Sequence, residues 1–233
     1  EITDEGKDLY PEIKKRAKQR LQNWRKGPEK NFDMVRLYMM LNFGYYITES
    51  SEHLSEYLPF FIKKNYPQLI TEFNIPLDEY PRRCINQIER WKEHKKSLRG
   101  DGLIHKRSHE YGSFIMEAIT TGEPVVIGGN VLNQGLITNL PRNACVEVSC
   151  LVDRNGVQGT YVGDLPEQCA ALNRTNINTQ LLTLEAAFTG KKDHIYQAAM
   201  LDPHTSAELS IDDIRSLCND LIKEHDQWLP KFK

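Results

Sequence analysis

The strongest constraint on the fold is a run in the middle of the chain whose side chains alternate in character. Across residues 144–153, alanine, valine and cysteine occupy every second position up to Val152. A period of two predicts a half-buried strand. Asn155 and Gly156 then form a strong hairpin signal, so residues 157–162 are predicted to pair with that strand. Two further strands are predicted before it, at residues 124–131 and 135–140.

Helical periods lie on both sides of this strand region. Helices, then strands, then helices indicate an α+β fold in which helices surround a small, mostly antiparallel sheet. The first ten residues have the character of a strand-and-turn fragment. The predicted helices cover residues 11–26, 33–42, 51–57, 81–98, 108–121, 166–189, 193–201 and 211–224.

Glycine supplies most of the helix ends, and one glycine pair interrupts a strand. Gly128 and Gly129 are the nearest approach to a dinucleotide-binding glycine motif, but they lie inside the predicted strand 124–131. In that position they indicate a bulge or a close backbone contact. A dinucleotide-binding fold is therefore not expected for these residues.

Composition excludes several classes of protein. The 233 residues, 39% of them hydrophobic, suffice for one large domain or two small ones, and the formal net charge is −2. Near-neutrality without a basic stripe argues against nucleic acid or a membrane surface as the partner. Five cysteines without a C-x-x-C pair argue against a disulfide framework and favour a reducing, cytoplasmic setting. The chain carries no initiator methionine, and we expect it to begin within a longer protein.

The segment from residue 42 to residue 57 concentrates groups that could do chemistry. Glu49, Glu52 and Glu56 could form a glycosidase acid/base pair, although glutamates at a helix start more often cap or are solvated. Ser50 or Ser51 is expected to cap a helical turn that carries His53 and Tyr57. Elsewhere, His105 and His109 have the spacing of two metal ligands on a helix, but a loop entering a helix is the preferred interpretation. No metal site is predicted on this chain.

Tyr57 is the most informative side chain of that segment. A phenol with a pKa near 10 becomes a base at neutral pH only after roughly 4 kcal/mol of differential stabilisation by nearby positive charge. Arg82 and Arg83, or a bound divalent ion, could supply that charge. The alternative is that Tyr57 only packs against Pro59 and Phe60.

Several motifs follow one another in order along the chain. They are residues 43–53 (FGYYITESSEH) with Glu56 and Tyr57, 76–84 (PLDEYPRRC), 129–141 (GNVLNQGLITNLP), 151–156 (LVDRNG), 163–178 (GDLPEQCAALNRTNIN) and 201–204 (LDPH). Together they resemble the C-terminal part of glycoside hydrolase family 4, and within it the α-galactosidase (melibiase) type. The likeness covers nearly the whole chain, and the fold that it implies is similar to the C-terminal domain of lactate and malate dehydrogenases.

The resemblance implies a redox-assisted elimination rather than a two-carboxylate displacement. NAD⁺ would remove hydride from sugar C3, a base would take the C2 proton, and a divalent metal, typically Mn²⁺, would hold the C2 and C3 oxygens. Tyr57 matches the base, Arg83 a substrate-contacting arginine, and Arg82 its neighbour. His53 and Asn133 could also line the site; alternatively, His53 satisfies a helix end and Asn133 a turn.

The chain departs from the family pattern in one large respect. It lacks the nucleotide-binding N-terminal half, with the cysteine and histidine that hold the metal and the proposed acid. Residues 1–233 are therefore interpreted as a C-terminal substrate and oligomerisation domain, inactive alone, whose partners are an α-galactoside, its own N-terminal domain and a further copy. Two alternatives stay open: another α-glycosidase of the family, such as an α-glucosidase or α-galacturonidase, and a non-catalytic dimerisation domain.

Overall fold

The computed structural model describes residues 3–98 and 110–233. They form two compact units, and each is described by itself. The helical unit comprises Glu1–Ile75 and Pro166–Lys233, and the sheet unit comprises Pro76–Leu165. The interpreted domain of residues 1–233 thus contains two compact bodies.

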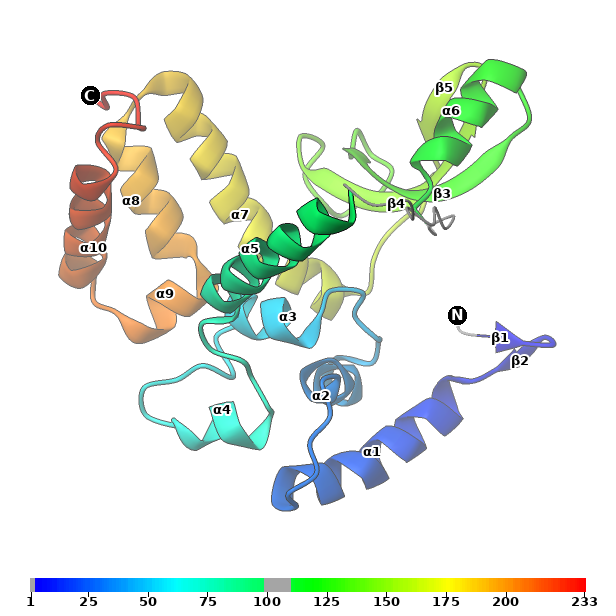
Figure 1. The fold of residues 1–233 in the computed structure, drawn as a ribbon, viewed down its shortest axis with the longest axis horizontal. Helices are drawn as coiled ribbons and strands as arrows, with labels where there is room; N and C mark the ends of the chain where they lie inside the picture. The colour runs from blue at the N-terminus through cyan, green and yellow to red at the C-terminus, as the bar shows by residue number, and fades with distance from the viewer. Residues whose placement is uncertain (1–2, 99–109) are drawn as a thin grey trace. The chain divides into compact units, whose positions relative to one another are not determined.

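The helical unit is built from two stretches of the chain that are separated by the sheet unit (Figure 1). Its first stretch opens with a two-stranded antiparallel hairpin, which agrees with the predicted strand-and-turn start. The elements of the first stretch are β1 (Thr3–Asp4), β2 (Lys7–Asp8), α1 (Tyr10–Lys26), α2 (Met34–Phe43), α3 (Ser51–Tyr57) and α4 (Gln68–Glu72). Those of the second are α7 (Glu167–Thr189), α8 (Lys192–Leu201), α9 (Pro203–Glu208) and α10 (Ile211–Glu224).

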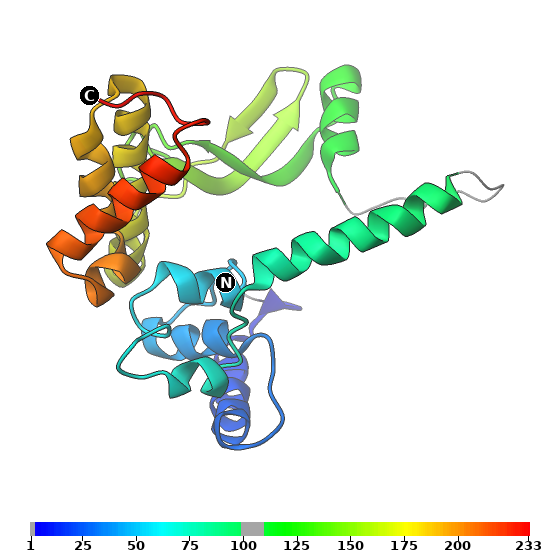
Figure 2. The same cartoon turned by 60° about the vertical axis from the view of Figure 1, so that its left-hand side comes forward.

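Helix α2 lies at the centre of the core of the helical unit. Met34 and Val35 are fully buried, and they cluster with Leu54 of α3 and with the side chains of Phe61 and Phe73. The rings of Phe61 and Phe73 meet edge to face, with centroids 5.1 Å apart. Such aromatic pairs add specific geometry to the area they bury. A second, smaller cluster joins α8 to α10, which lie side by side in Figures 1 and 2.

The sheet unit contains a three-stranded antiparallel sheet in the order β3 (Val125–Leu132), β4 (Cys145–Asp153), β5 (Gly156–Gly159). Inward-facing positions of β4 are buried in alternation, as its period of two predicts. The β3–β4 register runs without interruption through Gly128 and Gly129, so there is no bulge. A Cβ on Gly129 would lie 2.8 Å from Cys150 Sγ, and the close-contact interpretation is therefore confirmed.

Two helices complete the sheet unit. Helix α6 (Gly112–Thr121) packs against β3 and β4 and ends at Gly122, whose φ of 88° is left-handed. Helix α5 (Glu79–Ser97) contains no buried residue. Residues 108–109 of the helix predicted over 108–121 lie outside the described residues.

The α+β class, the antiparallel sheet and the long helices are confirmed, but the strand predicted over residues 135–140 is wrong. Residues 135–140 form a loop rather than a strand, because the Asn133 side chain binds their backbone groups and Gly135 takes a φ of 102°. Helix α7 agrees with the helix predicted over residues 166–189; along it Ile177 is buried, whereas Phe188 is 86% exposed. The short helices α4 and α9 were not predicted from the sequence.

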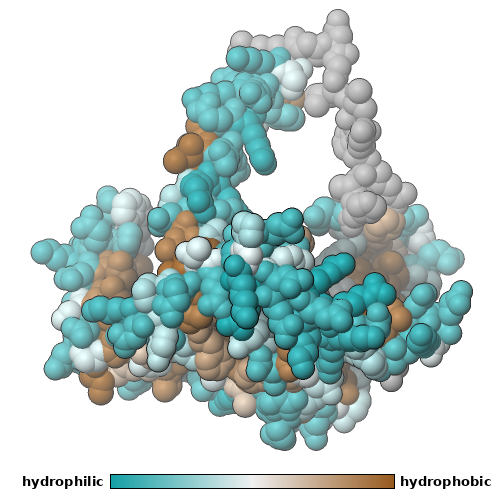
Figure 3. All heavy atoms as spheres, turned by 90° about the horizontal axis from the view of Figure 1, so that it is seen from below, coloured by the Kyte–Doolittle hydropathy of each residue, from teal (hydrophilic) through white to brown (hydrophobic). Residues whose placement is uncertain are grey.

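Much of the surface is hydrophilic, as Figure 3 shows for one face, where hydrophobic patches are separated by charged and polar residues. Among the described residues, no helix combines the length and the apolar character that crossing a bilayer demands.

Candidate functional site

The helix that carries Tyr57 begins at a well-formed cap. Ser50 takes an extended backbone conformation, and its Oγ accepts a hydrogen bond from the backbone N–H of His53 at 3.3 Å. Glu49 Oε1 in turn accepts from the N–H of Ser50 at 2.7 Å. Ser50, rather than Ser51, is therefore the cap that satisfies the open end of α3.

Arg36 of α2 fixes the segment that leads into this cap. Its Nη1 donates to the backbone oxygens of Thr48 and Glu49, at 3.2 and 3.4 Å. Its backbone N–H donates to Ser51 Oγ at 3.2 Å. Arg36 therefore joins α2 to two places: its side chain binds the turn before α3, and its backbone N–H binds the first residue of α3.

The guanidinium of Arg36 is itself held in place. Its Nε pairs with Asp33 Oδ1 at 2.5 Å, and Tyr46 donates its hydroxyl to Asp33 Oδ2 at 2.9 Å. Burial and the bond to Asp33 raise the pKa of Tyr46, so this phenol stays protonated and donating. Sequence analysis missed Arg36; the signal was a pair of opposite charges three residues apart at the start of α2.

His53, Glu56 and Tyr57 lie together on one side of α3. His53 Nδ1 is 3.1 Å from Glu56 Oε2. The rings of His53 and Tyr57 are nearly parallel, with an angle of 19° and centroids 6.3 Å apart. Tyr57 remains 44% exposed, so it is not a core residue of the helical unit. The structure thus brings together two of the predicted site residues, His53 and Tyr57.

The charges around Tyr57 oppose its ionisation. Partial burial, then Glu49 and Glu56, raise the pKa of this phenol above its ordinary value. The pKa of His53 is also raised, first by its hydrogen bond to Glu56 and, against burial, by the charges of Glu52, Glu56 and Glu49. The groups of the helical unit that shift the pKa of Tyr57 therefore all oppose the tyrosinate that a base needs.

Arg82 and Arg83 lie on α5, in the sheet unit. Both bind Glu79: Arg82 through Nη2 and Arg83 through Nε, each at 3.0 Å. These bonds hold the pKa of Glu79 below its usual range, and the bond from Arg83 has the larger effect. Both guanidiniums are more than half exposed, with 55% and 58% of the side chain accessible. Their action on Tyr57 or on a sugar stays a prediction.

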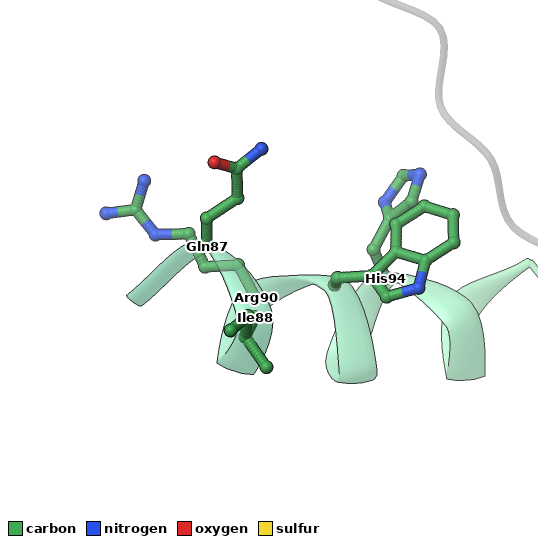
Figure 4. A pocket seen from close by; sticks show the side chains of 5 residues that line it. Gln87, Ile88, Arg90 and His94 are labelled. Carbon is green, nitrogen blue, oxygen red and sulfur yellow. The ribbon is translucent and has the colours of Figure 1, made fainter. Parts of the chain in front are cut away.

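Helix α5 also presents uncovered apolar groups. Ile85, Ile88 and Trp91, which recur at three-residue spacing along the helix, are 61%, 57% and 58% exposed. A hollow of about 760 Å³ lies on this helix, and Figure 4 shows its described lining. The side chains that line it are those of Gln87, Ile88, Arg90, Trp91 and His94.

Asn133 is fully buried in the sheet unit and works within its own loop. Its Nδ2 donates to the backbone oxygens of Ile137, Leu140 and Pro141 at 2.9–3.1 Å. Its Oδ1 accepts from the Ile137 N–H at 2.7 Å. These bonds agree with the turn alternative, and a sugar contact by Asn133 stays a prediction.

The described residues hold neither a cluster of metal-ligand side chains nor a dinucleotide-binding glycine loop. Across residues 3–98 and 110–233, no group of three or more His, Cys, Asp or Glu side chains is placed to hold a metal ion. His105 and His109 lie outside these residues. Gly128 and Gly129 sit within β3 rather than at a strand-to-helix turn, where a dinucleotide-binding glycine loop would lie.

Solved structures share this fold. Protein lplD of Bacillus subtilis is 24% identical, with a TM-score of 0.79 over 92% of this chain and 50% of that chain. A 6-phospho-α-glucosidase from gut microorganisms, solved in complex with NAD and Mn²⁺, is 19% identical, with a TM-score of 0.63 over 99% of this chain and 52% of that one. At these identities the likeness shows the fold alone.

Sequence comparison identifies the family. An α-galactosidase of Bacillus subtilis (strain 168) is 59% identical over 234 residues, which cover 100% of this chain and 53% of that protein. The chain thus spans about half the length of the relatives it matches. Residues 1–205 match the sequence model of the family 4 glycosyl hydrolase C-terminal domain. Because that match covers most of the chain, the chain belongs to the family 4 glycosyl hydrolases, in the region of their C-terminal domain.

Proposed function

We propose that this chain is the C-terminal, substrate-handling domain of a longer α-galactosidase. The observation that carries the proposal is its 59% identity, along its whole length, to an α-galactosidase. The substrate would be an α-galactoside such as melibiose, and the cofactors NAD and a divalent metal such as Mn²⁺. In support of these cofactors, a protein of the same fold was solved with both NAD and Mn²⁺.

The cofactor and the metal would be held mainly by a part of the longer protein outside this chain. The described residues provide neither a metal-ligand cluster nor a strand-to-helix glycine loop. The chain's own contribution would be a base and sugar contacts. It would also contact the cofactor-binding part and another copy of the protein.

Tyr57 is the proposed base that takes the proton from sugar C2. Its ring is held on a capped and anchored helix, and it remains 44% exposed and so open to a substrate. Glu49 and Glu56 raise its pKa, so the positive charge that turns it into a base would come from outside the helical unit. Arg83 and Arg82, both largely exposed, are the proposed sugar contacts.

The location proposed for this enzyme is the cytoplasm. All five cysteines are free, and Cys150 and Cys218 are buried. Free thiols are typical of proteins kept in a reducing compartment.

The test uses the longer protein and two measurements: hydrolysis of p-nitrophenyl α-galactoside, and exchange of the C2 proton in deuterated water. Tyr57→Phe removes the proton acceptor, so both rates should fall by about 10²–10⁴-fold, the usual contribution of a general base. Tyr66→Phe is the matched control, because Tyr66 is similarly exposed, at 53%, in the same unit. Unchanged C2 exchange in Tyr57→Phe would remove Tyr57 from the mechanism.

Two further measurements check the wider proposal. The 233-residue chain alone should show no tight NAD binding by calorimetry and no galactoside hydrolysis. In the longer protein, galactosides should be turned over faster than glucosides or galacturonides. A preference for either of the other two sugars would reassign the substrate within the family.

A further inference from the structure

The proposed base has two neighbours on its own helix that no role yet explains. Glu56 lies three positions after His53 and Tyr57 four positions after it, so all three lie on one face of α3. The imidazole lies close to both neighbours: its Nδ1 is 3.1 Å from the Glu56 carboxylate, and its ring is nearly parallel to the Tyr57 ring, with centroids 6.3 Å apart. We infer that His53 and Glu56 form a positioning pair for Tyr57, and this inference rests on the proposed function.

The geometric part of the role follows from the hydrogen bond. Glu56 accepts from the Nδ1–H of the imidazole and so fixes the orientation of the ring plane. The fixed imidazole would then limit how far the Tyr57 ring can turn, because the two rings are neighbours, nearly parallel at 19° with centroids 6.3 Å apart. A base must lie within hydrogen-bond reach of the proton it takes, and misplacement by about 1 Å can reduce the rate about 10²-fold.

The electrostatic part follows from the charges. Glu56 by itself disfavours a phenolate on Tyr57. When His53 is protonated, the pair is close to neutral and this opposition is largely cancelled. The pKa of His53 is raised, chiefly by Glu56, so the charged pair persists toward neutral pH.

Other charges near α3 do not replace this pair. Glu49 and Glu52 lie at the start of α3, and both favour the protonated form of His53. Helices α2 and α9 pack against α3. On α2, Arg36 pairs with Asp33 and donates to the backbone oxygens of Thr48 and Glu49. On α9, Glu208 pairs with Lys63, and His204 lies near Glu208.

The test compares His53→Asn, Glu56→Gln and the double variant in the longer enzyme, with p-nitrophenyl α-galactoside as the probe. Each single variant should reduce kcat about 10- to 100-fold while KM changes less than about twofold. His53→Asn leaves Glu56 without its cation, so the acid limb of the kcat profile should move to higher pH by roughly 0.5 to 1 unit. The double variant removes both charges and should return that limb toward the wild-type position.

These substitutions should leave folding intact, because both side chains are exposed: 41% for His53 and 49% for Glu56. Glu12→Gln, which breaks an exposed pair with Arg16 on α1, is the control and should leave kcat and the limb unchanged. Wild-type kcat and limb in both single variants would overturn the inference. The inference would also be overturned if the acid limb of the kcat profile were shifted as far in the double variant as in His53→Asn. Neither result touches the proposed function, which fails instead if Tyr57→Phe retains C2 exchange.

Discussion

Helices α3 and α5 both carry residues assigned to the site, yet the chain holds the two helices in different ways. Helix α3 has only seven residues, and Ser51, Leu54 and Ser55 are buried. Helix α5 has nineteen residues, and none is buried. Its N-cap residue, Asp78, has a φ of 57° and makes no side-chain capping bond.

The difference shows which site residues this chain orients by itself. A helix of two turns is too short to be stable alone, so α3 depends on the Ser50 cap and on Arg36. Those contacts also fix the direction of Tyr57. Arg82 and Arg83 have Glu79 as a partner on their own helix, and the apolar groups of α5 stay uncovered within the described residues. The orientation of Arg82 and Arg83 in the enzyme would therefore depend on a protein surface outside the sheet unit that covers α5.

The largest effect is expected from removing the anchor of α3. Arg36→Ala loses the pair with Asp33 and the bonds to the Thr48 and Glu49 carbonyls, and these groups are mostly buried. Hydrogen bonds to charged groups contribute about 1.5–3 kcal/mol, so we expect the free energy of unfolding to fall by about 2–3 kcal/mol. Urea unfolding of the 233-residue chain, followed by circular dichroism, measures the change.

Arg16→Ala is the control for that prediction. Arg16 pairs with Glu12 on α1, but its side chain is 66% exposed, and exposed pairs contribute little. Its unfolding midpoint should match that of the wild type. If Arg36→Ala also left the unfolding midpoint unchanged, α3 would not be anchored better than α5, and the contrast between the two helices would be lost.

A smaller effect is expected on the uncovered side of α5. Trp91→Gln replaces a large side chain that is 58% exposed, so the unfolding free energy of the 233-residue chain should change by no more than about 0.5 kcal/mol. In the longer protein the same substitution should be clearly destabilising if another surface covers α5. Trp228→Gln, at a residue 72% exposed near the C-terminus, should be silent in both. Thermal unfolding of the four variant proteins distinguishes these outcomes.

The parts of the fold that the sequence predicts are those whose causes are local. Gly44, Gly122 and Gly190 end three helices with left-handed φ values of 92°, 88° and 65°. Each of these glycines predicts a helix end from the sequence alone. The alternation in β4 is equally local. The loop at residues 135–140 is not, because it depends on Asn133 binding backbone oxygens as far as Pro141.

In the candidate site too, the features with local causes are predictable from the sequence, and those that depend on distant residues are not. Spacing alone predicts a cap at Ser50 or Ser51 and a helical turn that carries His53 and Tyr57, and the structure identifies Ser50 as the cap. The anchoring by Arg36 does not follow from spacing, since it joins residues twelve to fifteen positions apart. Nor does spacing reveal that Glu49 and Glu56 raise the pKa of Tyr57, because that requires knowing which charges the fold brings close.

The smallest effect concerns the proton on His53. Its hydrogen bond to Glu56 raises its pKa above 6.5, so the protonated histidine contributes stability that is complete below its unfolded pKa. That contribution is lost as the pH rises through the folded pKa, and it is small because the pair is exposed. Nuclear magnetic resonance titration of the histidine ring should therefore give a pKa above 6.5 in the wild type and a lower pKa in Glu56→Gln. Glu12→Gln should leave this titration unchanged, whereas equal pKa values in wild type and Glu56→Gln would show that the carboxylate does not hold the imidazole of α3 in solution.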